Sequence, residues 1–217
     1  DWTAVWDSHD QLGEDTGWHL FARRTTSDGT LLSGELPVND TEEAIWFGTQ
    51  AVDIDATDEM AVSWSTSDGV VMFERSTPAG VGLGEFPVGV GSDRTAVAGL
   101  GDNRAVVAWT DDDGWGDGVV LRCVTDVGVA GPVVPANTTI EGNQYYPTLA
   151  AAADGHFAIL WYSSSGDSNL RARLFDRDCA ALGDEIPIDD AASAPTSNAR
   201  IGMGGDGAFE VVWDIHG

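Results

Sequence analysis

The chain has 217 residues, 42% of them hydrophobic and 9% aromatic, enough apolar material for one larger all-β domain or a row of repeated units. Its 36 acidic and 10 basic residues give a formal net charge of −26, and every basic residue is arginine. Nucleic acid and anionic membranes are therefore poor partners. No apolar run approaches the roughly 18 residues of a membrane span, so we expect no membrane insertion.

Short apolar runs that end in tryptophan recur along the chain, at 3–6, 61–64, 106–109, 158–161 and 210–213. A second kind of run alternates with them without exception, at 34–38, 84–88, 131–136 and 183–188. Such self-similarity indicates a repeat architecture. We therefore treat 1–217 as a single domain of repeats or a segment of one. Its repeats are about 2–59, 60–104, 105–156 and 157–208, with an extra strand at 209–217.

Each period holds four short β-like runs, and no segment shows a helical apolar period. In the third period run b is 105–109, run c is 119–124 and run d is 132–136, and run a at 144–151 leads into the next tryptophan run. Run d contains proline, which cannot donate to a strand ladder and so marks an edge strand. A four-stranded unit with an edge proline and one large aromatic is typical of a propeller blade. The sequence predicts an all-β fold, a β-propeller of about four four-stranded blades.

The order of these features resembles a bacterial family. A tryptophan run, a polar loop, a strand with arginine, a glycine turn and then Gly84, Glu85, Phe86, Pro87 and Val88 follow one another. This order is similar to the propeller-type tandem repeats of large secreted or surface proteins of bacteria, including myxobacteria. The resemblance covers essentially the whole chain. It implies a propeller fold and a secreted or cell-surface location, and it carries no shared catalytic residues.

The strand count does not close a four-bladed ring. Run b occurs five times, whereas runs a, c and d occur four times each. One b strand would be redundant in such a ring. We therefore expect a partial ring that is completed by additional repeats or by another copy in a homo-oligomer.

The tryptophans fall into two groups. Those that end the b runs are predicted to fill the core between neighbouring blades rather than to stack on sugars: Trp6, Trp64, Trp109, Trp161 and Trp213. Outside that register, Trp18, Trp46 and Trp115 are the predicted ligand-binding residues. The alternative for these three is that they cover the roots of loops.

Arginines recur in run c, at Arg23 or Arg24, Arg75, Arg122 and Arg173. We expect them to pair with carboxylates of a neighbouring blade and so to brace the ring. The alternative is capture of an anionic ligand, which requires guanidinium groups that face solvent together.

The two cysteines lie in adjacent units. Cys123 ends run c of one unit, and Cys179 lies in the turn between runs c and d of the next. In adjacent blades the end of run c and the turn between runs c and d lie on the same face of the propeller. One disulfide bridge is therefore feasible and would support a secreted location. Two separate thiols are the alternative.

No catalytic constellation emerges, and we predict no catalytic residues. The four histidines lack metal-ligand spacing, and no serine lies in a GxSxG motif. A glycosidase needs two facing carboxylates, but any such pair could be chosen by chance among 36 acidic residues. Three functions stay open: an extracellular binding or adhesion module for carbohydrate or protein, a structural repeat segment of a larger surface protein, and a glycosidase-like enzyme.

Carboxylates concentrate in the loops after run b and in the connections from run d to run a, which share one face of a propeller. The predicted binding face is therefore acidic and bears tryptophans. Within 111–117, closely spaced carboxylates and glycines resemble part of a calcium loop but lack its full spacing. Calcium is the one candidate cofactor, and if it binds here we expect Asp111, Asp113 and Asp117 as its ligands. A solvated acidic loop and a contact with a cationic partner are the alternatives.

Overall fold

The computed structural model describes residues 2–9, 18–39, 45–46, 48–55, 57–129, 131–166, 168–190 and 198–215, with the backbone alone at 92 and 93. Within these ranges every regular element is a β-strand, which confirms the all-β prediction. The described residues form no helix that could cross a membrane.

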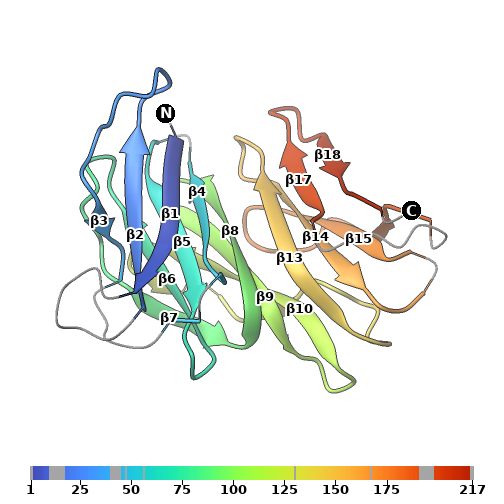
Figure 1. Cartoon of the computed structure of the whole chain (residues 1–217). Coiled ribbons are helices and arrows are strands. Elements are labelled where there is room, and N and C mark those ends of the chain that lie inside the picture. Colours follow the sequence, from blue (N-terminus) through green and yellow to red (C-terminus); the bar gives the residue numbers. More distant parts are fainter. Residues whose placement is uncertain are drawn as a thin grey trace.

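Five antiparallel sheets follow one another along the described chain (Figure 1). The first contains β1 (Trp2–His9), β2 (Trp18–Thr25) and β3 (Leu36–Pro37). The second contains β4 (Ala51–Ile54), β5 (Met60–Ser65), β6 (Val70–Ser76) and β7 (Phe86–Val90). The third contains β8 (Ser92–Gly101), β9 (Arg104–Asp112) and β10 (Asp117–Thr125), with β11 (Gly128–Val129) and β12 (Val134–Pro135) both paired with β10.

The last two sheets complete the series. The fourth contains β13 (Gln144–Ala151), β14 (Phe157–Ser163), β15 (Leu170–Phe175) and β16 (Ile186–Pro187). The fifth contains β17 (Arg200–Met203) and β18 (Phe209–Val212). Run 144–151 is β13, the first strand of the fourth sheet, and it pairs with the tryptophan strand β14. In the second, third and fourth sheets the tryptophan run is therefore the second strand.

The first strands of the sheets lie next to one another in the middle of the molecule (Figure 1). β4 contacts β8, β8 contacts β13, and β13 contacts β17. β3, β7 and β16 lie at the outer ends of their sheets. Each of these outer strands contains a proline, as predicted for edge strands. This radial order of sheets is that of propeller blades.

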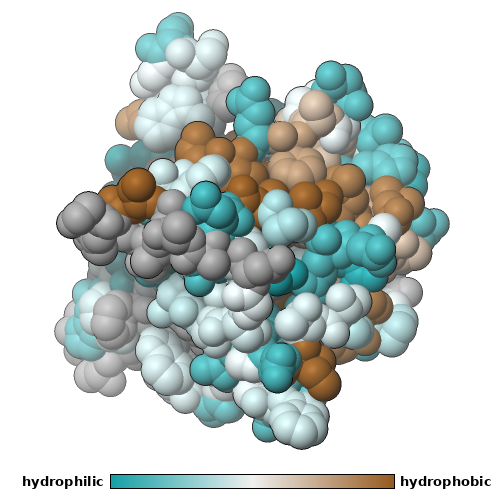
Figure 2. Space-filling view, turned by 90° about the vertical axis from the view of Figure 1, so that its right-hand side faces the viewer, coloured by the Kyte–Doolittle hydropathy of each residue, from teal (hydrophilic) through white to brown (hydrophobic). Residues whose placement is uncertain are grey.

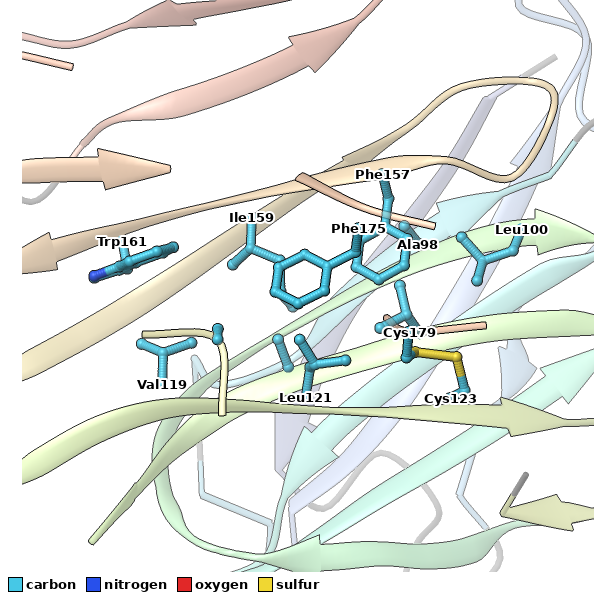
Figure 3. Close-up of a cluster of buried hydrophobic side chains, with 14 residues drawn as sticks. Ala98, Leu100, Val119, Leu121, Cys123, Phe157, Ile159, Trp161, Phe175 and Cys179 are labelled. Atoms are coloured by element: carbon cyan, nitrogen blue, oxygen red, sulfur yellow. A yellow bond between two sulfur atoms is a disulfide. The ribbon is translucent and has the colours of Figure 1, made fainter. Parts of the chain in front are cut away.

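The repeated tryptophans pack between sheets. Trp64, Trp109 and Trp161 are fully buried, and each belongs to a cluster with side chains of the preceding sheet. Figure 3 shows Trp161 and Ile159 of β14 facing residues of β10, among them Leu121. Their predicted core role is confirmed.

A disulfide joins the third and fourth sheets beside this cluster (Figure 3). Cys123 on β10 and Cys179 after β15 have Cα atoms 6.1 Å apart and are separated by 56 residues in sequence. Of the two alternatives, the structure shows the bridge. Cys179 has a φ of 65°, the left-handed conformation that Gly29 and Gly155 adopt at the same position of similar turns. A non-glycine residue is strained there.

Of the arginines of run c, Arg75 pairs with Asp55 and Glu59 of its own sheet, so the predicted neighbouring-blade partner is wrong for it. Others connect neighbouring sheets, by two means. Arg24 pairs with Asp58 of the second sheet, at 2.6 Å, as predicted. Arg122 and Arg173 instead donate to backbone carbonyls of the preceding sheet, those of Val88 at 2.8 Å and Ala136 at 3.0 Å. The predicted carboxylate partners are therefore wrong for these two. The carbonyls that they bind lie in or beside outer strands, where backbone groups lack a further strand to pair with.

The fifth sheet is incompletely covered. Val212 is 67% exposed, whereas the residue before the tryptophan in β9 and β14, Ala108 and Leu160, is fully buried. Trp213 is 39% exposed, so the predicted core role is wrong for this tryptophan. Figure 2 shows hydrophobic residues gathered in a band across the side of the molecule where this sheet lies.

Candidate functional site

A cavity of about 410 Å³ opens where the inner strands β4, β8, β13 and β17 begin. We call it the channel mouth. Its polar and aromatic wall residues come from these strands, from the segments that lead into them and, for Tyr162, from β14: Gln50, Arg94, Tyr146, Thr148, Tyr162, Asn198 and Arg200. A concave site of this size with convergent polar groups is the usual form of a small-ligand pocket. Four successive sheets contribute to it, so it exists only in the folded array.

Tyr146 occupies a strained position in this wall. Its φ is 56°, and the pairing of β13 with β14 shifts register between Tyr145 and Thr148. Pro147, which follows it, cannot donate to the ladder and disfavours a helical conformation of its predecessor. Bulges of this kind redirect a side chain, and backbone strain of about 1–3 kcal/mol clusters at functional sites. Tyr146 is therefore a strong candidate for a functional residue.

The Tyr146 ring lies between a cation and two other aromatic rings. The guanidinium carbon of Arg94 lies 5.0 Å from its centroid, which is a cation–π distance. The ring centroids of Tyr145 and Tyr162 lie 4.8 Å and 6.2 Å from it. This aromatic cluster fixes the side of the mouth that β13 forms.

The backbone of Ala199 holds two further side chains of the wall. Its N–H donates to the Tyr162 hydroxyl at 2.9 Å, and its carbonyl accepts from Arg200 at 2.8 Å. Burial raises the pKa of Tyr162 above its ordinary value of 10.0. The phenol is therefore neutral at physiological pH and keeps its O–H as a donor.

Two amides of the wall are anchored by carboxylates. Gln50 Nε2 donates to Asp7 at 2.8 Å, and Asn198 Nδ2 donates to Asp214 at 3.3 Å. Neither Asp7 nor Asp214 is among the described lining residues, and no carboxylate is. The charged groups of the described wall are the guanidinium groups of Arg94 and Arg200. The mouth is thus a neutral-to-positive site in a strongly acidic chain.

A second cavity of about 430 Å³ lies further along the same strands. Asp53 lines it and accepts a hydrogen bond from the Gly99 N–H at 2.8 Å, which ties β4 to β8. Burial raises the pKa of Asp53, because water no longer solvates the charged form. Asp55 also lines this cavity and pairs with Arg75, and the other lining residues are apolar or glycine.

The predicted ligand-binding tryptophans lie outside the described wall of the channel mouth. Trp18 begins β2 and packs against the core cluster between the first two sheets. Trp46 is 50% exposed in the connection to β4, two residues before Gly48 of the mouth. Trp115 is 76% exposed at the tip of the β9–β10 hairpin. The structure does not bring these three side chains together in one described pocket.

The predicted calcium ligands lie in and beside the same hairpin. Asp111 accepts a hydrogen bond from the Asp112 N–H at 2.8 Å, and Asp113 accepts one from the Trp115 N–H at 3.0 Å. Asp117 begins β10 opposite Asp112. In the part of the chain that the structure describes, no three His, Cys, Asp or Glu side chains are grouped closely enough to hold a metal ion. Calcium binding at Asp111, Asp113 and Asp117 stays a prediction.

Sequence reasoning did not single out Arg94, Tyr146 or Arg200. None of the three belongs to a series of identical residues that recurs from unit to unit. Alignment of the repeats therefore does not point to any of them. Pro147 within run a was the available sign, because a proline inside a non-edge strand indicates a bulge.

No family model matches the chain, and no curated protein matches it in sequence. The resemblance to repeats of myxobacterial type therefore has no sequence-level support. Similar solved structures do exist, and among them are propeller-type glycosidases and a lectin.

One similar structure is an alpha-L-arabinanase of Penicillium chrysogenum, complexed with arabinobiose, with a TM-score of 0.60 and 15% identity over 89% of this chain and 67% of that one. Another is the NanB sialidase of Streptococcus pneumoniae, with a TM-score of 0.60 and 11% identity over 92% and 33%. A third is the BP39L lectin of Burkholderia pseudomallei, with a TM-score of 0.53 and 15% identity over 98% and 66%. At these identities the likeness shows the fold alone, a β-propeller type that this chain shares. The chain spans from a third to about two thirds of these proteins.

Proposed function

We propose that the chain is a carbohydrate-binding module and that the channel mouth is its binding site. The observation that carries the proposal is the convergence of Arg94, Tyr146, Tyr162 and two anchored amides on one cavity at the inner strands. Guanidinium, amide and phenol groups supply the donors and acceptors that sugar hydroxyls require. The fold shared with propeller-type glycosidases and a lectin supports a carbohydrate ligand.

Binding is favoured over hydrolysis by the composition of the wall. Glycoside hydrolysis generally uses two carboxyl groups on either side of the scissile bond. The described wall offers none, and the carboxylates of Asp7 and Asp214 hold the amides of Gln50 and Asn198. Those hydrogen bonds orient groups that would contact a ligand.

We further propose that Trp46 extends the site at its rim, since its half-exposed side chain lies two residues from Gly48. The ligand face would then combine the channel mouth with one of the predicted tryptophans. A secreted or cell-surface location is part of the proposal, and the disulfide supports it, because such bonds persist in oxidising compartments.

A glycan array tests the proposal. We expect the wild-type chain to bind a subset of glycans, Tyr146→Ala to lose binding and Tyr146→Phe to keep it, because phenylalanine retains the ring beside Arg94. Trp115→Ala is the matched control, an aromatic truncation at the far tip of a hairpin. Loss of binding in Trp115→Ala alone would move the site to the tip of the β9–β10 hairpin. No binding of the wild type to any glycan would favour a purely structural repeat segment.

A further inference from the structure

The arginines of this chain are almost all engaged with acceptors. Six of the ten form ion pairs with described carboxylates: Arg23, Arg24, Arg75, Arg104, Arg171 and Arg177. Arg122 and Arg173 each donate to two backbone carbonyls. Such use is expected in a chain with 36 acidic residues, where a carboxylate is seldom far away.

Arg94 and Arg200 are the two that remain. No carboxylate of the described residues lies within ion-pair distance of either guanidinium group. Arg94 contacts the Tyr146 ring, and Arg200 donates to the Ala199 carbonyl. Both line the channel mouth, and both side chains are exposed. Most of their N–H donors are therefore available to a ligand.

Their surroundings keep these two guanidinium groups in place and ready to bind. The strained backbone at Tyr146 places an aromatic ring beside Arg94, and stacking of this kind leaves the donor edge of a guanidinium group free. The backbone of Ala199, itself bonded to Tyr162, holds Arg200. Gln50 and Asn198 add neutral amides to the same wall.

We propose that the channel mouth recognises an acidic sugar, one that carries a carboxylate such as a uronic acid, through Arg94 and Arg200. The proposal rests on the carbohydrate-binding function proposed above and names the class of its ligand. The planar guanidinium fork matches a carboxylate with two parallel hydrogen bonds, and hydrogen bonds of this charged kind are about twice as strong as neutral ones. A neutral sugar would leave both cations without an anionic partner.

The test compares matched probes on the full chain. An array carries uronic-acid-containing oligosaccharides, each beside the same oligosaccharide with its carboxyl group reduced to the alcohol. Measurements at an ionic strength of about 0.15 M screen the long-range repulsion by the acidic surface beyond about 8 Å. We expect at least one acidic probe to bind about tenfold or more tightly than its reduced counterpart.

Variants assign the preference to the two residues. Arg94→Gln and Arg200→Gln should lower the affinity for the acidic probe by a larger factor than the affinity for the reduced probe, and so narrow the difference between the two probes. Arg177→Gln, which removes an exposed arginine paired with Asp102, is the control and should change neither. Melting temperatures of all variants show whether each is folded.

The outcomes separate this inference from the function on which it rests. Binding of neutral glycans alone, equal binding of both members of each pair, or an equal loss for both members in the arginine variants would overturn the acidic-sugar inference while the proposed function stands. Binding of no glycan at all would overturn both.

Discussion

Among single residues, the glycines opposite Trp109 determine how closely the second and third sheets pack. A Cβ atom added at Gly89 would lie 2.3 Å from the Trp109 ring, which is itself fully buried and donates to the Val90 carbonyl at 2.9 Å. Atoms that close cannot coexist, so one of the two must move. The tryptophan therefore needs a residue without a side chain beside it.

We expect Gly89→Ala to destabilise the protein by about 1–3 kcal/mol, the usual effect of overpacking. Chemical denaturation measures the change. Gly34→Ala is the control, because nothing lies within 4 Å of a Cβ atom there. Equal stability of the two variants would show that the Trp109 packing is looser than described.

Cys179 combines a covalent bond with an unfavourable backbone conformation. Its φ of 65° suits glycine, so a cysteine is strained at this position. The same cysteine forms the disulfide with Cys123, which stabilises the fold. We expect Cys123→Ala with Cys179→Gly to be more stable than Cys123→Ala with Cys179→Ala by about 1 kcal/mol, because alanine keeps the strain and glycine relieves it.

Both double variants should be less stable than the oxidised wild type. Chain entropy across a bridge of 56 residues accounts for about 4 kcal/mol of this loss. Thermal unfolding of the three proteins gives the comparison. If the variant with Cys179→Gly proved less stable than the one with Cys179→Ala, the result would argue against the left-handed conformation.

Repetition decided which residues could be predicted. Trp64, Trp109 and Trp161 share one register, so their common burial followed from the pattern. Arg94 and Tyr146 occur once each, and their importance arises from a bulge and a stacked ring that bring distant strands together. Such features depend on backbone geometry that periodicity does not encode.

Among connecting elements, the segment between the third and fourth sheets is fastened by Glu185. This carboxylate accepts hydrogen bonds from the Thr139 N–H and the Thr138 hydroxyl, each at 2.8 Å, and pairs with Arg171 at 3.2 Å. Burial by itself would raise the pKa of Glu185, but the hydrogen bonds from Thr138 and Thr139 outweigh it and lower the pKa below the ordinary 4.5. The folded state thus favours the charged form.

A lowered folded-state pKa stabilises the protein above the unfolded pKa and loses this contribution as the pH falls through the folded value. We expect Glu185→Gln to be destabilised by about 1–3 kcal/mol at pH 7 and the difference from wild type to shrink as the pH falls below 4.5. Unfolding at several pH values measures this. Glu35→Gln, which affects a more exposed pair with Arg23, should change stability less. A difference that is independent of pH would contradict the assignment.

At the scale of the whole molecule, the fifth sheet leaves hydrophobic side chains exposed. Its Val212 is 67% exposed at a position that is buried in the third and fourth sheets. We expect a homo-oligomer to cover this face in the 217-residue chain, and additional repeats to do so where the polypeptide is longer. The sedimenting mass should therefore exceed 22.8 kDa.

A charged substitution locates the contact. Val212→Asp should return the chain to a 22.8 kDa species, whereas Val127→Asp, at a position that is 90% exposed in a turn, should not. A wild-type chain that sediments as a single species of monomer mass would contradict the expected self-association.

The sequence allowed the all-β class, the edge prolines and the core tryptophans to be predicted, because alternating runs with a fixed aromatic leave few packings available. From the sequence we predicted the ligand site on acidic loops that carry tryptophans, because the composition of these loops is the most unusual in the chain. The channel mouth was missed because it forms only when the beginnings of β4, β8, β13 and β17 meet, and these segments are far apart in sequence. The number of blades in a complete ring stays a prediction.

The position of a bound sugar tests the central claim most directly. A crystal structure of the wild-type chain with a glycan that binds on the array should show the sugar in the channel mouth, against the Tyr146 ring and within hydrogen-bond distance of Arg94 or Arg200. A sugar bound at the β9–β10 hairpin or on the outer strands, with the mouth free of it, would contradict the account.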